Sequence, residues 1–312
     1  MLACKLIIQA TMSNALVRVE NLTKTFSELT AVNQLSFTVN QGDVYGFLGQ
    51  NGAGKSTTIR MLLTLIRPTS GSIEMFGYRL PTHHHEILRQ VGAIIERPDL
   101  YKYLSAYDNL DMMARLSGLK PSRQLLMEQL DKVGLAGRAH SKVKTFSQGM
   151  KQRLGIAIAM VHNPQLIILD EPTNGLDPQG IAEMRTMIID LRRLHGKTVI
   201  VSSHLLSEIE QMATRMIIID KGKKVVEGST EELFNPADTL VALQTSDPQA
   251  AEKLSRSPWA HALQPAQAGY LFKIHANQVP ALAKDIVAMD IAIENLSRQH
   301  SLETLFLQLT GK

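Results

Sequence analysis

The sequence has little cysteine and no long apolar run, and each shortage excludes a class of protein. Cys4 is the only cysteine among 312 residues, which excludes an internal disulfide framework and a cysteine-based zinc site. A reducing compartment is therefore the simplest expectation. A transmembrane helix needs about 18–20 mostly apolar residues. Charged residues and histidine bound the run Leu154–Val161, and Leu166–Leu169 stops at Asp170, so we expect that this chain does not itself cross a membrane.

The sequence also lacks a large excess of charge of one sign. The net charge is +4, from 33 basic and 29 acidic residues. Residues 237–312 hold six basic and seven acidic residues, so the basic excess lies in the first 236. This balance allows a phosphate-rich ligand without requiring one. Hydrophobic residues make up 44% of the chain, enough for a sizeable core, which excludes general disorder.

Short apolar strands alternate with helical segments over residues 14–235, which we interpret as one domain. We expect strands at residues 16–19, 35–39, 44–48, 72–76, 166–169, 198–202 and 216–219. Helices are expected at residues 56–65, 106–116, 122–133 and 182–194. This alternation predicts an α/β fold with a mostly parallel sheet covered on both faces. Residues from about 97 to 160 are mostly helical in character and predict a helical subdomain.

Residues 236–312 predict a second, smaller α+β domain, since Pro236 marks a boundary. Strands are expected at 239–244, 260–265, 270–275 and 291–297. Helices are expected at 249–256, 278–288 and 301–309. The first six elements have a βαββαβ order, which is that of ferredoxin-like folds.

The segment Gly49–Ser56 matches the phosphate-loop pattern G-x-x-x-x-G-K-[ST] between a predicted strand and a predicted helix. Glycines let the backbone approach phosphates closely, and the helix N-terminus adds positive partial charge. Lys55 is expected to reach the β- and γ-phosphates of ATP, and Ser56 to bind Mg²⁺. A purely structural glycine-rich turn is the alternative, which the strand-and-helix context disfavours. The predicted nucleotide-binding residues of this segment are Gly49, Asn51, Gly52, Ala53, Gly54, Lys55, Ser56 and Thr57.

Two carboxylates follow the apolar strand Leu166–Leu169. A carboxylate at the C-terminal end of a strand lies at the sheet edge where ligands bind. Asp170 suits the positioning of Mg²⁺, and Glu171 suits a general base for the attacking water. A lone pair of acids is often just the solvated start of a loop. Combined with the phosphate loop, the pair favours a nucleotide hydrolase.

The motifs that follow resemble those of the nucleotide-binding subunit of an ATP-binding cassette (ABC) transporter, over about residues 14–230. Phe146–Met150 resembles the ABC signature, and Asn174–Asp177 resembles the D-loop. His204 resembles the switch histidine. Phe26 lies where the family places an aromatic ring that stacks on adenine. The combination is specific, because unrelated phosphate-loop proteins lack the signature.

The resemblance implies a P-loop NTPase of the ABC type, with a mixed sheet flanked by helices, an antiparallel β subdomain and a helical subdomain. Two subunits would pair head to tail around two ATP molecules. Ser147, Gln148 and Gly149 would then meet the γ-phosphate from the opposite subunit. Asp177 would help to fit the subunits together. The resemblance implies a catalytic set of Lys55, Glu171 and His204.

Two motifs, the signature and the Q-loop, depart from the family pattern. Gln148 stands where the signature has Gly, and Met150 where it has Gln. Glu96, within Val91–Pro98, stands where the Q-loop has Gln. A carboxylate is a good ligand for Mg²⁺, so we expect Glu96 to keep the metal contact together with Ser56 and Asp170.

The Glu-bearing Q-loop, the run Gly149–Leu154 and the segment Leu302–Gly311 resemble bacterial bacitracin- and lantibiotic-resistance export ATPases. This resemblance implies a peripheral protein on the cytoplasmic face of a bacterial membrane. It would drive a separate permease that exports antibiotic-, peptide- or lipid-like substrates. A second nucleotide-binding subunit, expected to be a copy of this chain, would complete the ATPase.

A soluble ABC-type ATPase acting on ribosomes or DNA is the alternative reading. Ribosome-associated members usually carry two cassettes, and DNA-repair members insert a long coiled coil; neither feature is found in this sequence. Glu171 and His204 disfavour a third reading, a non-catalytic regulatory domain. His83–His85 predicts a solvated surface loop rather than a metal site. The basic cluster Lys221–Lys224 predicts a turn, and no nucleic-acid partner is expected.

Overall fold

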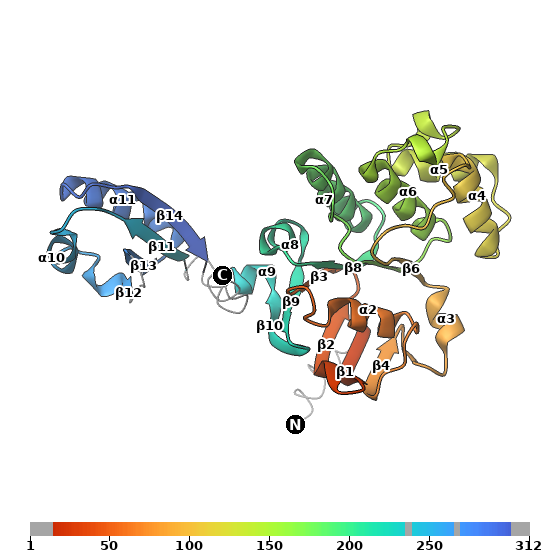
Figure 1. Ribbon diagram of the computed structural model, residues 1–312, viewed down its shortest axis with the longest axis horizontal. Helices are drawn as coiled ribbons and strands as arrows, with labels where there is room; N and C mark the ends of the chain where they lie inside the picture. Colours follow the sequence, from red (N-terminus) through yellow and green to blue (C-terminus); the bar gives the residue numbers. More distant parts are fainter. Residues whose placement is uncertain (1–14, 235–238, 265–268, 301–312) are drawn as a thin grey trace, which may run out of the picture. The chain divides into compact units, whose positions relative to one another are not determined.

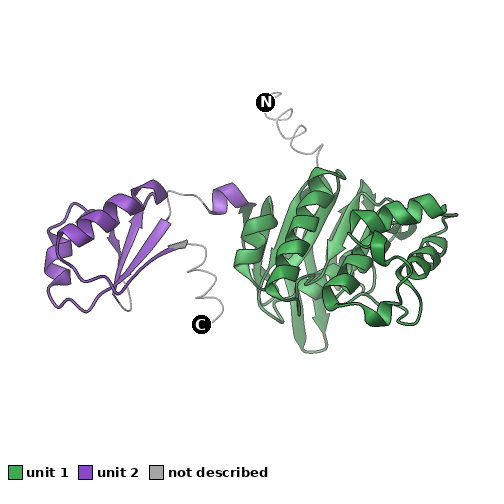
Figure 2. Cartoon of the chain, turned by 90° about the horizontal axis from the view of Figure 1, so that it is seen from above, with its two compact units in different colours: residues 1–228 green, residues 229–312 purple. Residues whose placement is uncertain are grey.

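The computed structural model describes residues 15–234, 239–264 and 269–300 (Figure 1). The chain divides into two compact units, residues 1–228 and residues 229–312 (Figure 2). Cys4, the expected helix at 301–309 and the segment Leu302–Gly311 lie outside the described residues.

Unit 1 contains an antiparallel sheet in the order β2-β1-β4-β5. Its strands are β1 (Ala15–Phe26), β2 (Leu29–Asn40), β4 (Ser70–Met75) and β5 (Tyr78–Arg79). The long hairpin β1–β2 extends well beyond the two short strands predicted from the apolar runs. Its apolar side chains, among them Val17, Val19, Phe37 and Val39, are buried against the core.

A six-stranded sheet in the order β10-β9-β3-β8-β7-β6 forms the centre of unit 1. Its strands are β3 (Val44–Leu48), β6 (Val91–Ile94), β7 (Leu166–Leu169), β8 (Thr198–Ser203), β9 (Arg215–Asp220) and β10 (Lys223–Ser229). Strands β9, β3, β8, β7 and β6 pair in parallel, and every residue of β3, β7 and β8 is buried. The predicted turn at Lys221 and Gly222 joins β9 to β10.

Helices cover this sheet. Helix α2 (Lys55–Leu62) packs its apolar residues into one core with both sheets, whereas α7 (Pro178–Arg193) and α8 (Leu206–Met212) pack against β3 and β8. Figure 1 shows α2 on one side of the sheet and the pair α7 and α8 on the other. This arrangement of sheets and helices confirms the predicted fold class.

The helical part of unit 1 contains α4 (Ala106–Leu116), α5 (Arg123–Lys132) and α6 (Gln148–Met160), with 3₁₀ turns at Ala136–Arg138 and Val143–Thr145. Ser105 caps α4 in a capping box with Asp108, and Ser122 caps α5. These caps fix where both helices begin.

The histidine triplet does not form the predicted loop. His83 is the N-cap residue of the short helix α3 (His84–Leu88), and His84 and His85 form its first turn. Ile87 in the same helix is fully buried, and its burial anchors the turn to the core. Among the described residues, no group of three or more His, Cys, Asp or Glu side chains is arranged to hold a metal.

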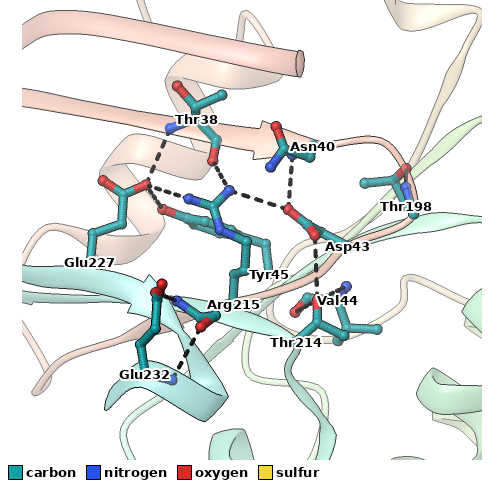
Figure 3. A network of polar contacts seen from close by, with 12 residues as sticks. Thr38, Asn40, Asp43, Val44, Tyr45, Thr198, Thr214, Arg215, Glu227 and Glu232 are labelled. Carbon is teal, nitrogen blue, oxygen red and sulfur yellow. Dashed lines mark hydrogen bonds and ion pairs between the residues drawn. The ribbon is translucent and has the colours of Figure 1, made fainter. Parts of the chain in front are cut away.

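A polar network fastens the antiparallel sheet to the central sheet (Figure 3). Arg215 on β9 donates from Nη1 to the Thr38 carbonyl on β2 over 3.0 Å, and the same nitrogen lies 3.5 Å from Asp43 Oδ2. The Tyr45 hydroxyl on β3 donates to Glu227 Oε1 on β10 over 2.7 Å. Burial, and next the nearby Glu227 carboxylate, raise the pKa of Tyr45 well above its usual value.

Unit 2 begins with α9 (Thr230–Leu233) and contains a four-stranded antiparallel sheet in the order β12-β13-β11-β14. Its strands are β11 (Thr239–Gln244), β12 (Leu263–Gln264), β13 (Tyr270–Ile274) and β14 (Asn295–His300), and its helices are α10 (Ala250–Ser255) and α11 (Val279–Ala288). Short 3₁₀ turns lie at Ala260–Ala262 and Ala276–Gln278.

The βαββαβ order of unit 2 is the one that the sequence predicts, although two strands are displaced. Residues 260–262 form a 3₁₀ turn, and the last strand begins at Asn295 rather than at residue 291. Trp259, whose indole donates to Asp285 over 2.9 Å, holds the turn against α11. The ferredoxin-like assignment stays a prediction. None of the helices in the described part of the chain has the length and apolar content that crossing a membrane requires.

Candidate active site

The loop between β3 and α2 is shaped by its glycines. Gly52 and Gly54 have φ angles of 84° and 105°, in the left-handed region that L side chains rarely adopt. A Cβ atom on Gly54 would lie 2.6 Å from the Ala31 carbonyl oxygen, and one on Gly49 would lie 2.5 Å from that of Ile219. The backbone therefore packs too closely for side chains, and the first turn of α2 follows directly with Lys55, Ser56 and Thr57.

Lys55 lies at the centre of the site and is only 5% exposed. Its Nζ donates to the carbonyl oxygens of Gly49 and Gln50 over 2.6 and 3.2 Å. The same nitrogen lies 3.1 Å from Glu171 Oε1, in an ion pair that lacks the angle of a directed hydrogen bond. Glu171 Oε2 in turn lies 2.8 Å from His204 Nδ1. Lys55, Glu171 and His204 thus form a continuous polar chain.

The contact between Glu171 and His204 determines which ring nitrogen of His204 carries the hydrogen. A carboxylate has only acceptor atoms, so Nδ1 of His204 carries the hydrogen in this contact. In the neutral ring, Nε2 is therefore an acceptor, and only the protonated ring donates from Nε2.

The backbone at Glu171 is held in an unusual conformation. Its φ angle is 49°, in the left-handed region, which costs a non-glycine residue on the order of 1–3 kcal/mol. The Glu171 N–H donates to Ser202 Oγ over 2.8 Å, and the Ser202 hydroxyl donates to Asp170 Oδ1 over 2.6 Å. Ser202, near the end of the neighbouring strand β8, therefore holds the Asp170 carboxylate and the Glu171 backbone at once.

Asp170 has the character of a metal ligand. It is fully buried, and its Oδ2 atom has no hydrogen-bond partner in the described part of the chain. It lines a cleft of about 490 Å³ together with Ser56, Glu96 and Glu171. An unpartnered carboxylate oxygen beside a hydroxyl fits Mg²⁺, which uses one or two carboxylates together with substrate phosphates.

Glu96 lies at the wall of the same cleft, directly after β6 and Ile95. Its φ angle is 59°, and its Oε1 lies 2.8 Å from Nη2 of Arg60, on α2. Both side chains are exposed, so this ion pair contributes little stability, typically about 0–1 kcal/mol. The pair does link the helix after the phosphate loop to the segment that enters the helical subdomain.

The signature residues lie at the start of α6. Ser147 is its N-cap residue, and the hydroxyl oxygen accepts from the Met150 N–H over 3.2 Å. Gly149 is open, because the nearest atom to a Cβ there would be Leu176 Cδ2 at 4.0 Å. Gln148 is partly exposed beside it. None of the described residues that line the Asp170 cleft comes from this signature.

Asp177 and Phe26 lie at exposed positions. Asp177 caps α7, accepting from the Gly180 N–H over 3.0 Å, a structural role that the sequence reading missed. Phe26 ends β1 with 44% of its surface exposed, and Lys24 Nζ lies 4.8 Å from the ring centroid. One face of the ring therefore carries a cation.

The sequence reading also missed the hydroxyl groups that flank the catalytic candidates. Ser202, Ser203 and Thr173 all bond to carboxylates, of Asp170 in the first case and Glu208 in the other two. The only sequence signal was position, because each residue lies one or two residues from His204 or Glu171.

A glycine-shaped phosphate loop, paired carboxylates after β7 and a histidine after β8 define a P-loop ATPase. The family model described as ABC transporter matches residues 32–174, and a model of an AAA domain matches residues 139–210. The chain is 42% identical to the bacitracin transport ATP-binding protein BcrA of Bacillus licheniformis, covering 96% of this chain and 98% of that protein. It is 40% identical to the uncharacterized ABC transporter ATP-binding protein YhcH of Bacillus subtilis, covering 95% and 96%. The chain therefore belongs to the ATP-binding subunits of ABC transporters, which are ATPases.

Shorter matches support the same assignment. The lantibiotic transport ATP-binding protein SrtF of Streptococcus pyogenes is 45% identical, covering 70% of this chain and 96% of that protein. A solved ATP-binding subunit of an ABC transporter has a TM-score of 0.61 and 31% identity, covering 70% of this chain and 91% of that one. The resemblance predicted from the sequence is confirmed.

Proposed function

We propose that this chain hydrolyses ATP to drive a separate membrane permease that exports antibiotic-, peptide- or lipid-like substrates. The polar chain Lys55–Glu171–His204 beside the unpartnered Asp170 oxygen is the observation that carries the catalytic part of this proposal. Similarity to a bacitracin transport protein along almost the whole of both chains supports the transport part.

ATP binding is assigned to the phosphate loop and to Phe26. The exposed ring of Phe26 stacks on adenine, while backbone N–H groups of the phosphate loop receive the phosphates. Lys55 then exchanges its carbonyl and carboxylate partners for the β- and γ-phosphates. The groups that we assign to the nucleotide are Phe26, Gly49, Asn51, Gly52, Ala53, Gly54, Lys55, Ser56 and Thr57.

The chemistry is an in-line transfer of the γ-phosphoryl group to water. Glu171 accepts a proton from the attacking water as the bond to the β-phosphate oxygen breaks, which leaves ADP and phosphate. His204, oriented by its Nδ1 contact to Glu171, presents Nε2 to the water when neutral and to the γ-phosphate when protonated. Glu171 and His204 thus both act on the attacking water and the γ-phosphate beside it.

Asp170, Ser56 and Glu96 are the residues that we assign to Mg²⁺. When bound, Mg²⁺ supplies positive charge that offsets the charge developing on the phosphate oxygens. The buried Asp170 keeps its ligand oxygen fixed through Ser202, so little reorganisation accompanies the reaction.

A second copy of the chain completes each site in this proposal. Ser147, Gln148 and Gly149 approach the γ-phosphate from the partner, where the start of α6 offers N–H groups and a partial positive charge. The open space around Gly149 allows that approach. Asp177 helps to fit the two subunits together.

The partner permease is assigned to the segment around residues 100–116. Tyr101, Tyr103 and Leu116 are large side chains with more than half of their surface exposed, and Tyr103 is 79% exposed. Exposed aromatic and apolar side chains of this kind typically mark a protein interface. This contact would hold the chain at the cytoplasmic face of the cell membrane.

The variant Glu171→Gln tests the catalytic assignment. Because an amide cannot take the water proton, we expect turnover to fall by at least about 100-fold, a loss typical of removing a general base. ATP binding should remain, and the ATP-bound variant should elute as a dimer. Phosphate release and size-exclusion chromatography measure both. Wild-type turnover in this variant would remove Glu171 from the role of base.

A further inference from the structure

We propose that Glu208 is a positioning residue that holds the general base Glu171 and the switch histidine His204 in register. This inference rests on the catalytic roles proposed above for those two residues. Glu208 lies on α8, and its carboxylate accepts hydrogen bonds from Thr173 and Ser203 rather than from either catalytic residue. It acts instead through the two segments that carry them.

One carboxylate oxygen joins these two segments. Glu208 Oε2 accepts a hydrogen bond from Thr173 Oγ1 and another from Ser203 Oγ, each over 2.8 Å. Thr173 lies two residues after Glu171, and Ser203 directly precedes His204. A shift of Glu208 would therefore displace both members of the catalytic pair.

Ser203 extends the connection to the phosphate loop. Its carbonyl oxygen accepts from the Gly49 N–H over 3.3 Å, and its Oγ accepts from the Leu205 N–H over 3.0 Å. These contacts fix the turn that carries His204. Glu208 thus holds a residue that contacts the first glycine of the phosphate loop.

The Glu208 carboxylate is buried, and burying a charged group without a cation beside it costs free energy. The residue is 6% exposed, and no ion pair within the described residues includes it. Two neutral hydroxyl groups compensate a buried carboxylate less well than a cation does. The carboxylate lies in the first turn of α8, where the positive partial charge of the helix N-terminus favours it, and its Oε2 atom aligns the two segments through the two hydroxyl groups.

Substitutions of Glu208 test this inference, and Glu210→Ala is the matched control because Glu210 is exposed on the same helix. We expect Glu208→Ala to lower kcat by about 10- to 100-fold, since small displacements of catalytic groups cost up to about 10²-fold. The KM for ATP should change by less than about 3-fold on the same reasoning. Glu208→Gln keeps an acceptor for both hydroxyls and should restore most of kcat.

Combining Glu208→Ala with Glu171→Gln distinguishes an effect through the catalytic residues from an unspecific disturbance of the structure. If Glu208 acts by placing Glu171 and His204, the double variant should lose less than the product of the two single losses, because displacement of the base no longer matters once Glu171 is Gln. The inference is overturned if the losses multiply, if KM rises with the fall in kcat, or if Glu208→Ala has wild-type kcat.

A Glu208→Ala chain that fails to fold would leave Thr173→Val as the decisive variant, because it removes one donor and keeps the volume. We expect it to lower kcat with unchanged KM, and unchanged kcat would overturn the inference. Failure of the catalytic assignment itself is distinguishable, because Glu171→Gln would then hydrolyse ATP at the wild-type rate.

Discussion

At the scale of single residues, the strongest feature is the way in which one serine and one lysine organise two carboxylates. Ser202 bonds to the Asp170 side chain and to the Glu171 backbone, while Lys55 pairs with the Glu171 side chain. Asp170 therefore keeps a buried oxygen without a hydrogen-bond partner among the described residues, which we assign to Mg²⁺. The Glu171 carboxylate instead lies between Lys55 and His204, where we assign it to the water proton, although the two carboxylates are adjacent in sequence. Their environments, rather than their chemical type, separate the two roles.

The carboxylate of Glu96, in the Q-loop, leads to a prediction about the Mg²⁺ concentration that the ATPase requires. We expect Glu96→Ala to raise the Mg²⁺ concentration for half-maximal ATPase activity by about 10-fold, the lower end of losses from altered ligand shells. Arg60→Ala is the matched control, because it breaks the 2.8 Å ion pair but leaves the carboxylate. Titrating Mg²⁺ against ATPase rate measures both. An unchanged Mg²⁺ requirement in Glu96→Ala would mean that Glu96 is no ligand.

The phosphate loop and the paired carboxylates could be predicted from the sequence because their residues are neighbours along the chain. Glu208 could not, since it lies 35 residues from Thr173 and only the folding of β7 beside β8 brings them together. The pairing of Glu96 with Arg60, 36 residues apart, was hidden for the same reason. Side chains that meet only after folding leave no pattern of neighbouring residues in the sequence.

At the scale of elements, buried strands and capped helices were predictable and long hairpins were not. The apolar runs at 44–48 and 166–169 match β3 and β7 to the residue. Helix α7, predicted from residue 182, begins at Pro178 because Asp177 caps it there. The hairpin β1–β2 exceeds its prediction because polar residues continue the pairing where the apolar alternation weakens.

The network between the two sheets predicts a loss of stability at high pH. The pKa of Tyr45 is raised in the folded protein, so above about pH 10, where an unfolded tyrosine ionises, the folded state holds more protons. The free energy of unfolding should therefore fall as the pH rises through 10, by up to about 1.4 kcal/mol per pH unit from this residue.

Tyr45→Phe tests that prediction. The variant should lose about 1–3 kcal/mol at pH 7, because Glu227 loses a donor, yet its decline above pH 10 should be shallower. Tyr103→Phe, at a residue that is 79% exposed, is the matched control. Urea unfolding at pH 9, 10 and 11 provides the comparison. An equally steep decline in Tyr45→Phe would show that another group causes it.

At the scale of the whole molecule, two exposed surfaces of the chain lie outside the cleft at Asp170. The signature at the start of α6 presents an open glycine and does not contribute to the cleft at Asp170. The segment around residues 100–116 exposes large aromatic and apolar side chains. We assign the first surface to a second copy of the chain and the second surface to a permease.

Recovery of a partner from native membranes decides whether this ATPase works on a membrane permease, as we propose. The tagged chain, purified in mild detergent from the cells that encode it, should bring down a multi-pass membrane protein in a fixed ratio. Tyr103→Ala should weaken that recovery while leaving the ATPase rate of the isolated chain unchanged, because Tyr103 lies outside the catalytic site. Recovery of ribosomes or DNA in place of a membrane protein would contradict the account.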